Sequence, residues 1–151
     1  MRNLSIVAIS SIMLLSVSIA HAATCTVATN NFNFGNYDVM NAAATIVTGT
    51  NLITVKCTRG KGTMTVDLST GGSGNYFPRA MKSGTNILTY NLYTTASLTT
   101  VWGNGTGGTA DVVQTFKNKS TTTLNVYGQI AAQQNVVPGA YGDSITVTVS
   151  F

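Results

Sequence analysis

Residues 144–151 read S-I-T-V-T-V-S-F, and apolar and polar side chains alternate along the whole stretch. A period of two places one row of side chains on a core and the other row in water, so we expect a β-strand here. The sequence ends on the apolar residue Phe151, and we expect nothing further to cover the strand edge beside it. A bare edge of this kind templates pairing with another chain. The stretch therefore predicts a domain that a partner completes.

The rest of the chain alternates in the same way between breaks of glycine, asparagine, serine and proline, and no window of about a dozen residues has a helical period. We expect strands over residues 25–28, 31–36 (or one interrupted strand over 25–36), 52–58, 63–68, 87–93, 121–130 and 144–151, with a short edge strand within 75–81. The turn at 59–62 predicts a hairpin between 52–58 and 63–68. Gly128 indicates a close backbone approach. Six or seven such strands predict an all-β chain folded as one β-sandwich.

Residues 1–22 have the organisation of a secretory signal peptide. Arg2 lies near the start, an apolar run of about 16 residues follows, and the small residues Ala20 and Ala22 occupy the positions that a signal peptidase reads. The run is short for a membrane span, so we expect no anchor. We expect cleavage before Ala23, which defines a domain of residues 23–151.

Charge gives little support for nucleic-acid binding. Residues 23–151 contain seven basic residues and four aspartates, a formal charge of +3. Nucleic-acid binders cluster basic residues with aromatic platforms, whereas the only local cluster here is Lys56, Arg59 and Lys61. We interpret it as a solvated turn, and expect no nucleic-acid partner.

The residues that general acid and base catalysis relies on are scarce. The chain has no glutamate, and its only histidine, His21, lies in the predicted leader. The four aspartates are scattered, so we expect no enzyme activity, no metal site and no cofactor. The G-x-G-x-x-G pattern at residues 103–108 is followed by polar and β-branched residues rather than a helix, which indicates a flexible turn and not a nucleotide site.

Two cysteines remain after the leader, Cys25 and Cys57. An even number of cysteines in an exported chain favours a disulfide. Closing a loop of this size stabilises a domain by about 3–4 kcal/mol in the chain-entropy model. A metal or redox pair would need more ligands or a Cys-x-x-Cys spacing.

Aromatic residues gather near strand ends and loops. We interpret most of them as packing at the rim of the sandwich, and keep as an alternative that Tyr76, Phe77 and Trp102 form a sugar- or surface-binding patch.

Taken together, these motifs resemble the spore coat protein U domain family, which also supplies subunits of archaic (Csu-type) chaperone-usher pili. The matching pieces are residues 25–27 (C-T-V), 32–38 (F-N-F-G-N-Y-D), 53–58 (I-T-V-K-C-T), 88–94 (L-T-Y-N-L-Y-T), 101–109 (V-W-G-N-G-T-G-G-T), 126–130 (V-Y-G-Q-I), 137–143 (V-P-G-A-Y-G-D) and the strand ending in Phe151. Their order and spacing make the resemblance specific.

The resemblance implies an incomplete immunoglobulin-like sandwich that lacks its final strand and has one disulfide, Cys25 to Cys57. A periplasmic chaperone would lend a strand to the resulting groove, and an outer-membrane usher would exchange it for the N-terminal extension of a sister subunit, a form of β-augmentation. It also implies that the groove takes its apolar side chains from the last strand and the first aromatic stretch: Ile145, Val147, Val149, Phe151, Phe32 and Phe34.

The chain departs from this family pattern at its predicted mature N-terminus. Only Ala23 and Thr24 would precede Cys25, whereas polymerising subunits carry an extension of about a dozen residues. We therefore expect a strand acceptor at a fibre tip, secreted through the periplasm to the cell surface and contributing to adhesion or biofilm formation. The alternative is a self-contained secreted coat or glycan-binding module that does not polymerise.

Overall fold

The structure is a computed structural model that describes residues 23–151, so the predicted leader, residues 1–22, lies outside the described residues. The described chain forms eight strands and one 3-10 turn: β1 (Thr24–Thr29), β2 (Thr45–Arg59), β3 (Gly62–Leu68), η1 (Gly71–Ser73), β4 (Arg79–Ser83), β5 (Asn86–Tyr93), β6 (Val112–Phe116), β7 (Ser120–Ile130) and β8 (Val147–Ser150). They build a five-stranded sheet, β1-β2-β7-β5-β4, and a three-stranded sheet, β6-β3-β8. The predicted all-β sandwich is confirmed.

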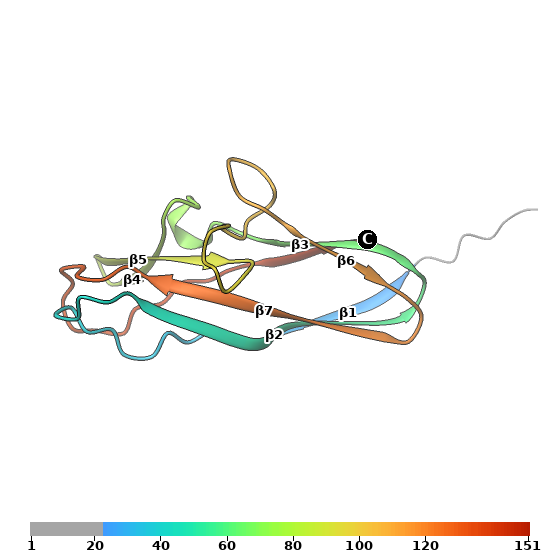
Figure 1. The fold of residues 1–151 in the computed structure, drawn as a ribbon, viewed down its shortest axis with the longest axis horizontal. Coiled ribbons are helices and arrows are strands. Elements are labelled where there is room, and N and C mark those ends of the chain that lie inside the picture. Colours follow the sequence, from blue (N-terminus) through green and yellow to red (C-terminus); the bar gives the residue numbers. More distant parts are fainter. Residues whose placement is uncertain (1–22) are drawn as a thin grey trace, which may run out of the picture.

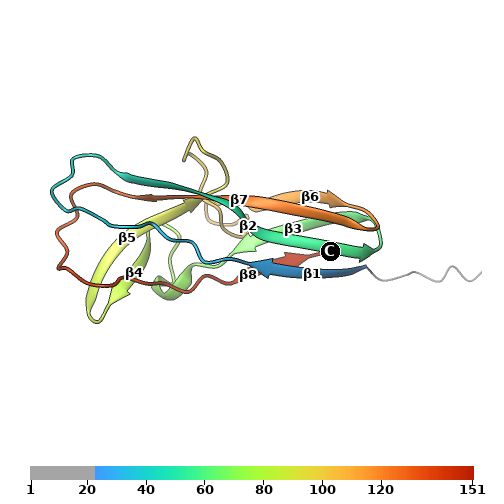
Figure 2. The same ribbon diagram turned by 90° about the horizontal axis from the view of Figure 1, so that it is seen from below.

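The two sheets form an elongated, two-layered molecule in which the smaller sheet covers only part of the larger one (Figure 1). Along the remaining part run two irregular segments, residues 30–44 after β1 and residues 131–146 before β8 (Figure 2). These segments take the place that strands of a complete second sheet would have. The fold is therefore a full sandwich at one end and a partly covered sheet at the other.

One hydrophobic core lies between the sheets. It is built from the inward rows of the long strands: Ile53, Val55 and Cys57 of β2, Met64, Val66 and Leu68 of β3, Leu88, Tyr90 and Leu92 of β5, and Leu124, Val126 and Ile130 of β7. Burying each large apolar side chain contributes about 1.5–3 kcal/mol. Trp102, between β5 and β6, joins this core, and its indole N–H donates to the Val66 carbonyl at 2.9 Å.

The predicted hairpin between residues 52–58 and 63–68 is wrong. β2 pairs with β1 and β7 in the larger sheet, whereas β3 pairs with β6 and β8 in the smaller one. The turn at Gly60, which has a φ of +94°, carries the chain from one sheet to the other. A hairpin and a corner between sheets share the same signal, two alternating stretches around a glycine-rich turn, so local sequence does not separate them.

Further elements differ from expectation, among them β2, which begins at Thr45 rather than at residue 52. Residues 31–36 form no strand, because Phe32 and Phe34 turn onto the core while the backbone lacks a neighbouring ladder. β6 was not predicted, since Gln114 lies on its inward row and interrupts the apolar alternation. The last strand pairs regularly only over Val147–Ser150 rather than over residues 144–151.

Candidate partner-binding groove

A groove of about 1050 Å³ opens along the partly covered half of the larger sheet. Residues 29–39 form one wall and residues 136–145, with Val147, form the other. Its floor is the inward row of the larger sheet together with one residue of β3: Leu52, Ile53, Leu88, Leu92, Val126, Ile130, Met81 and Leu68. The groove therefore gives direct access to the apolar core of the domain.

The first wall is held by two phenylalanine rings on a glycine. Phe32 and Phe34 pack edge to face with ring centroids 4.8 Å apart, and Phe34 lies 5.6 Å from the ring of Tyr90. Both rings cover Gly128 of β7, where an added Cβ would lie 2.6 Å from Phe32 and 2.7 Å from Phe34. The sequence predicts a close backbone approach at Gly128, but two side-chain rings rather than another backbone lie against it, and they leave no room for a Cβ.

The second wall continues into β8, whose inward row is only half-buried. Ile145, Val147 and Val149 alternate with the exposed residues Thr146 and Thr148. On the neighbouring strand β3, by contrast, Val66 and Leu68 are 0% and 2% exposed. Since β8 lies at the edge of the smaller sheet, its inward side chains are covered from one side and open on the other. This edge and the groove together are suited to an added strand.

The structure places four of the six predicted groove residues in the groove and two outside it. Phe32, Phe34, Ile145 and Val147 line it. Val149 is half-buried against the core beyond the groove. Phe151 lies past the end of β8, exposed, with its ring 5.5 Å from Phe116.

A carboxylate fixes the second wall to the larger sheet. Asp143 accepts hydrogen bonds from the Tyr90 hydroxyl at 2.7 Å and from the backbone N–H groups of Gly72 and Ser144 at 2.8 Å each. Burial, and then the hydrogen bond and charge of Asp143, raise the pKa of Tyr90. Tyr90 therefore stays protonated and serves as the donor to this contact, which positions the chain ahead of β8.

A buried arginine, Arg79, helps to position the same wall through hydrogen bonds to Ser69. The Arg79 guanidinium donates to the carbonyls of Ser69 and Trp102 at distances from 2.6 to 3.0 Å and to the Asn91 side chain at 2.8 Å. Ser69 in turn exchanges hydrogen bonds with Thr146 through its backbone N–H and its hydroxyl oxygen. Burial lowers the pKa of Arg79. The arginine thus links the core to the chain that leads into β8.

The three aromatics considered as a surface patch do not form one. Trp102 is 1% exposed and belongs to the core, which corrects its assignment to the surface. Tyr76 is half-buried, donates its hydroxyl to the Leu68 carbonyl and lies over Arg79 at 5.0 Å. Only Phe77 presents its ring to solvent, with 48% exposure. Trp102 is inward because its loop folds back between the sheets, a contact between distant segments that local sequence does not reveal.

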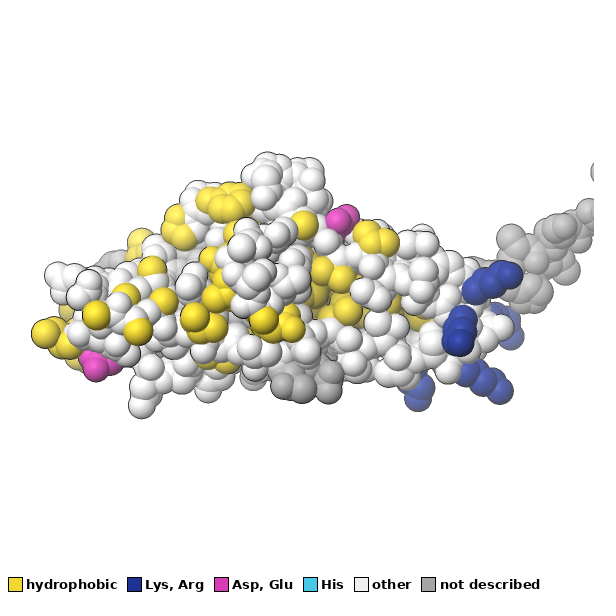
Figure 3. All heavy atoms as spheres, in the orientation of Figure 1, with side chains coloured by type: hydrophobic (Ala, Val, Ile, Leu, Met, Phe, Trp, Pro, Cys, Tyr) yellow, Lys and Arg dark blue, Asp and Glu magenta, His cyan; other side chains and the backbone are white. Residues whose placement is uncertain are grey.

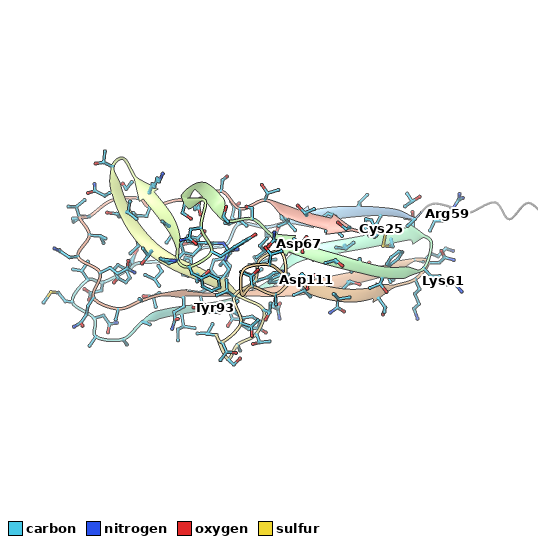
Figure 4. The ribbon with its side chains drawn as sticks, turned by 90° about the horizontal axis from the view of Figure 1, so that it is seen from above. Cys25, Arg59, Lys61, Asp67, Tyr93 and Asp111 are labelled. Atoms are coloured by element: carbon cyan, nitrogen blue, oxygen red, sulfur yellow. A yellow bond between two sulfur atoms is a disulfide. The ribbon has the colours of Figure 1, made fainter. Side chains whose placement is uncertain are left out.

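The predicted disulfide between Cys25 and Cys57 is confirmed. It joins β1 to β2, in which these two residues face each other across the ladder. The bond lies at the end of the molecule near Arg59 and Lys61 (Figure 4). It therefore fastens the first strand at the end where the sandwich is complete.

Two carboxylates lie near each other at the middle of the molecule, Asp67 and Asp111 (Figure 4). Burial, and then the charge of Asp111, raise the pKa of Asp67, and one Asp67 oxygen is buried without a hydrogen-bond partner. Within residues 23–151, no group of three potential metal-ligating residues comes together. The same part of the chain contains no helix long and apolar enough to cross a membrane.

The sequence did not identify the polar contacts that position the groove. In the sequence, Asp143 is one of four scattered aspartates and Arg79 one of seven basic residues in 23–151, and neither position signals its partner. A tyrosine on an apolar row, as at Tyr90, signals that its hydroxyl needs a partner. Which residue supplies that partner depends on contacts between segments about 50 residues apart.

Comparison with known proteins relates most of the chain to one family. Residues 11–148 match the family described as Spore Coat Protein U domain. The chain is 33% identical over 130 residues to Protein U of Myxococcus xanthus, a match that covers 79% of this chain and 70% of that protein.

A solved structure shares the fold. It is the crystal structure of the CsuC-CsuE chaperone-tip adhesion subunit pre-assembly complex from archaic chaperone-usher Csu pili of Acinetobacter baumannii. One of its chains superposes with a TM-score of 0.57 at 23% identity. The match covers 86% of this chain but only 40% of that one.

Proposed function

This chain belongs to the Spore Coat Protein U domain family, and on that premise we propose that it is a structural subunit of an exported chaperone-usher pilus that accepts a strand from another protein. Residues 1–22 are its leader and residues 23–151 its working domain. The role is mechanical rather than catalytic. The chain reaches the cell surface through the periplasm and contributes to adhesion or biofilm formation there.

The observation that carries the proposal is the groove beside a half-buried last strand. The inward side chains of β8 are open on the side away from β3, and the core is accessible through the groove. An apolar groove beside the edge of a sheet favours an extended segment with alternating apolar side chains, because such a segment can fill the groove and pair with the edge at once.

The proposed partners are those of the family that the chain resembles, and the chaperone–subunit complex that shares its fold supports a chaperone among them. In the periplasm, a chaperone would lend the strand, and at the outer membrane an usher would mediate its replacement by the N-terminal segment of a sister subunit. Cleavage before Ala23 would leave two residues ahead of Cys25, too few to fill a neighbour's groove. We therefore place the subunit at the distal end of a fibre.

Thermal unfolding of the exported full chain tests the proposal. We expect a low melting temperature for the chain alone and a clear increase with a synthetic peptide of about a dozen residues that alternates apolar and polar side chains. A scrambled peptide of the same composition, in which alternation is lost, is the control. Val147→Thr removes apolar surface from the groove and should weaken peptide binding about fourfold. Thr148→Ser, on the exposed row, should leave it unchanged.

A second candidate is an extracellular coat component that folds without a donated strand. The family description, Spore Coat Protein U domain, favours it, and the chain is 33% identical to Protein U of Myxococcus xanthus. Cooperative melting of the chain alone at high temperature, with no response to any alternating peptide, would favour the coat component and exclude strand acceptance.

A further inference from the structure

Basic residues that are distant in sequence meet at one end of the molecule. Lys56 lies near the end of β2, Arg59 and Lys61 lie at the turn from β2 to β3, and Lys117 and Lys119 lie at the turn from β6 to β7; all five are exposed. Strand pairing brings the two turns together, because Cys57 faces Ser120 and Gly62 faces Phe116. Figure 3 shows Lys and Arg side chains gathered at this end. We call these five residues the basic pole.

The charge of the basic pole is not balanced locally. Neither turn contains an aspartate or glutamate. Asp38 and Asp143 line the groove, and Asp67 and Asp111 lie near the middle of the molecule, away from Arg59 and Lys61 (Figure 4). Five of the seven basic residues within residues 23–151 thus form one positive end on a chain of small net charge. Such a concentration of one sign attracts anionic partners over distances of about a Debye length.

We propose that the basic pole binds an anionic polysaccharide through its carboxylate or sulfate groups. Four of the five cations are lysines, which act as hydrated point charges on flexible stems and suit anions spaced along a polymer better than one fixed bidentate ligand. Single-stranded nucleic acids are bound through aromatic stacking platforms in a charged groove. Residues 56–61 and 117–121 contain no aromatic residue, and the exposed ring beside them, Phe151, is packed edge-on against Phe116, so the two turns offer charge without a row of stacking platforms.

The basic pole and the groove are separate sites. None of the five cations lines the groove. Polysaccharide binding is therefore expected to be the same with the groove empty or filled by a peptide. The result does not depend on whether the chain accepts a strand, so either proposal can fail without the other.

Binding of the exported full chain to immobilised alginate and dextran sulfate, at about 50 mM and about 300 mM salt, tests the proposal. We expect binding to both polymers at low salt, weaker binding at high salt, and none to uncharged dextran. Lys61→Gln and Lys117→Gln should each weaken binding about two- to fivefold. Lys82→Gln removes the same charge from an exposed lysine outside the basic pole, and should leave binding unchanged.

Three results would overturn the proposal. The first is no binding to either anionic polymer at low salt. The second is an equal loss with Lys82→Gln, which would indicate an effect of net charge rather than of the basic pole. The third is binding to duplex DNA or to vesicles of anionic phospholipid that is as tight as binding to alginate and equally sensitive to Lys61→Gln, which would assign another class of partner.

Discussion

Gly128→Ala is expected to destabilise the domain only while Phe32 and Phe34 cover that position. A Cβ at residue 128 would lie 2.6 Å from the Phe32 ring and 2.7 Å from the Phe34 ring. Forcing extra atoms into such a contact costs about 1–3 kcal/mol. Alanine in a strand is favoured over glycine by about 0.5–1 kcal/mol. The free energy of unfolding should therefore fall by up to about 2.5 kcal/mol.

The effect of Gly128→Ala on the free energy of unfolding should change sign when the two rings are removed. In a Phe32→Ala, Phe34→Ala background the collision is absent, so Gly128→Ala should stabilise the domain by about 0.5–1 kcal/mol. Urea unfolding of the four proteins forms a double-mutant cycle whose coupling free energy should be about 1–3 kcal/mol. Gly142→Ala is the control, since a Cβ there meets nothing within 4 Å, and its effect should be the same in both backgrounds.

The same cost in both backgrounds would refute the placement of Phe32 and Phe34 on Gly128. The first wall of the groove would then have a different position, and the floor would be more open than described. Unchanged stability in the presence of the rings, with a gain in their absence, would still support the contact but show that the rings yield easily.

Three other predictions concern stability. Asp143→Ala leaves the Tyr90 hydroxyl without its acceptor and should cost about 1–3 kcal/mol; in urea unfolding, Tyr90→Phe should cost less, because no buried hydroxyl is left unpaired, and the opposite order would contradict this account. The pKa of Asp67 is raised above its ordinary value of 3.8. Protonated Asp67 therefore contributes to the free energy of unfolding below about pH 3.8, and this contribution is lost as the pH rises through the folded-state pKa. Asp67→Asn should therefore raise the melting temperature at pH 7 and leave it unchanged at pH 3, whereas an equal gain at both would exclude ionisation as the cause. Replacing Cys25 and Cys57 together by alanine should cost about 2–4 kcal/mol, and the wild-type chain with a reductant should show the same shift of its urea midpoint.

Alternation along the sequence was enough to predict the fold class and most strands. β3, β5 and β7 lie close to their predicted bounds because apolar residues recur on the inward row of each. β6 escaped prediction since Gln114 occupies an inward position, and residues 31–36 were assigned wrongly because Phe32 and Phe34 alternate without a strand to pair with. Alternation reports which side chains face inward, and it does not report whether a neighbour is present.

The groove depends, more than the fold class does, on contacts between residues that are distant in the sequence. The alternating row of Ile145 and Val147 predicted a strand with one inward face, and both residues line the groove. The contacts of Asp143 with Tyr90 and Gly72, and the burial of Trp102, join segments that only the assembled sheets bring together. The basic pole is the same kind of feature, because Lys117 and Lys119 meet Lys56, Arg59 and Lys61 only through strand pairing.

The unequal coverage of the larger sheet has a consequence for the fate of the protein in the cell. Residues 30–44 and 131–146 are long irregular stretches with much of their backbone outside any ladder, and such stretches are the preferred places for proteases to cut. A bound segment in the groove would shield both at once. Proteases would then degrade molecules with an empty groove faster than molecules whose groove is filled.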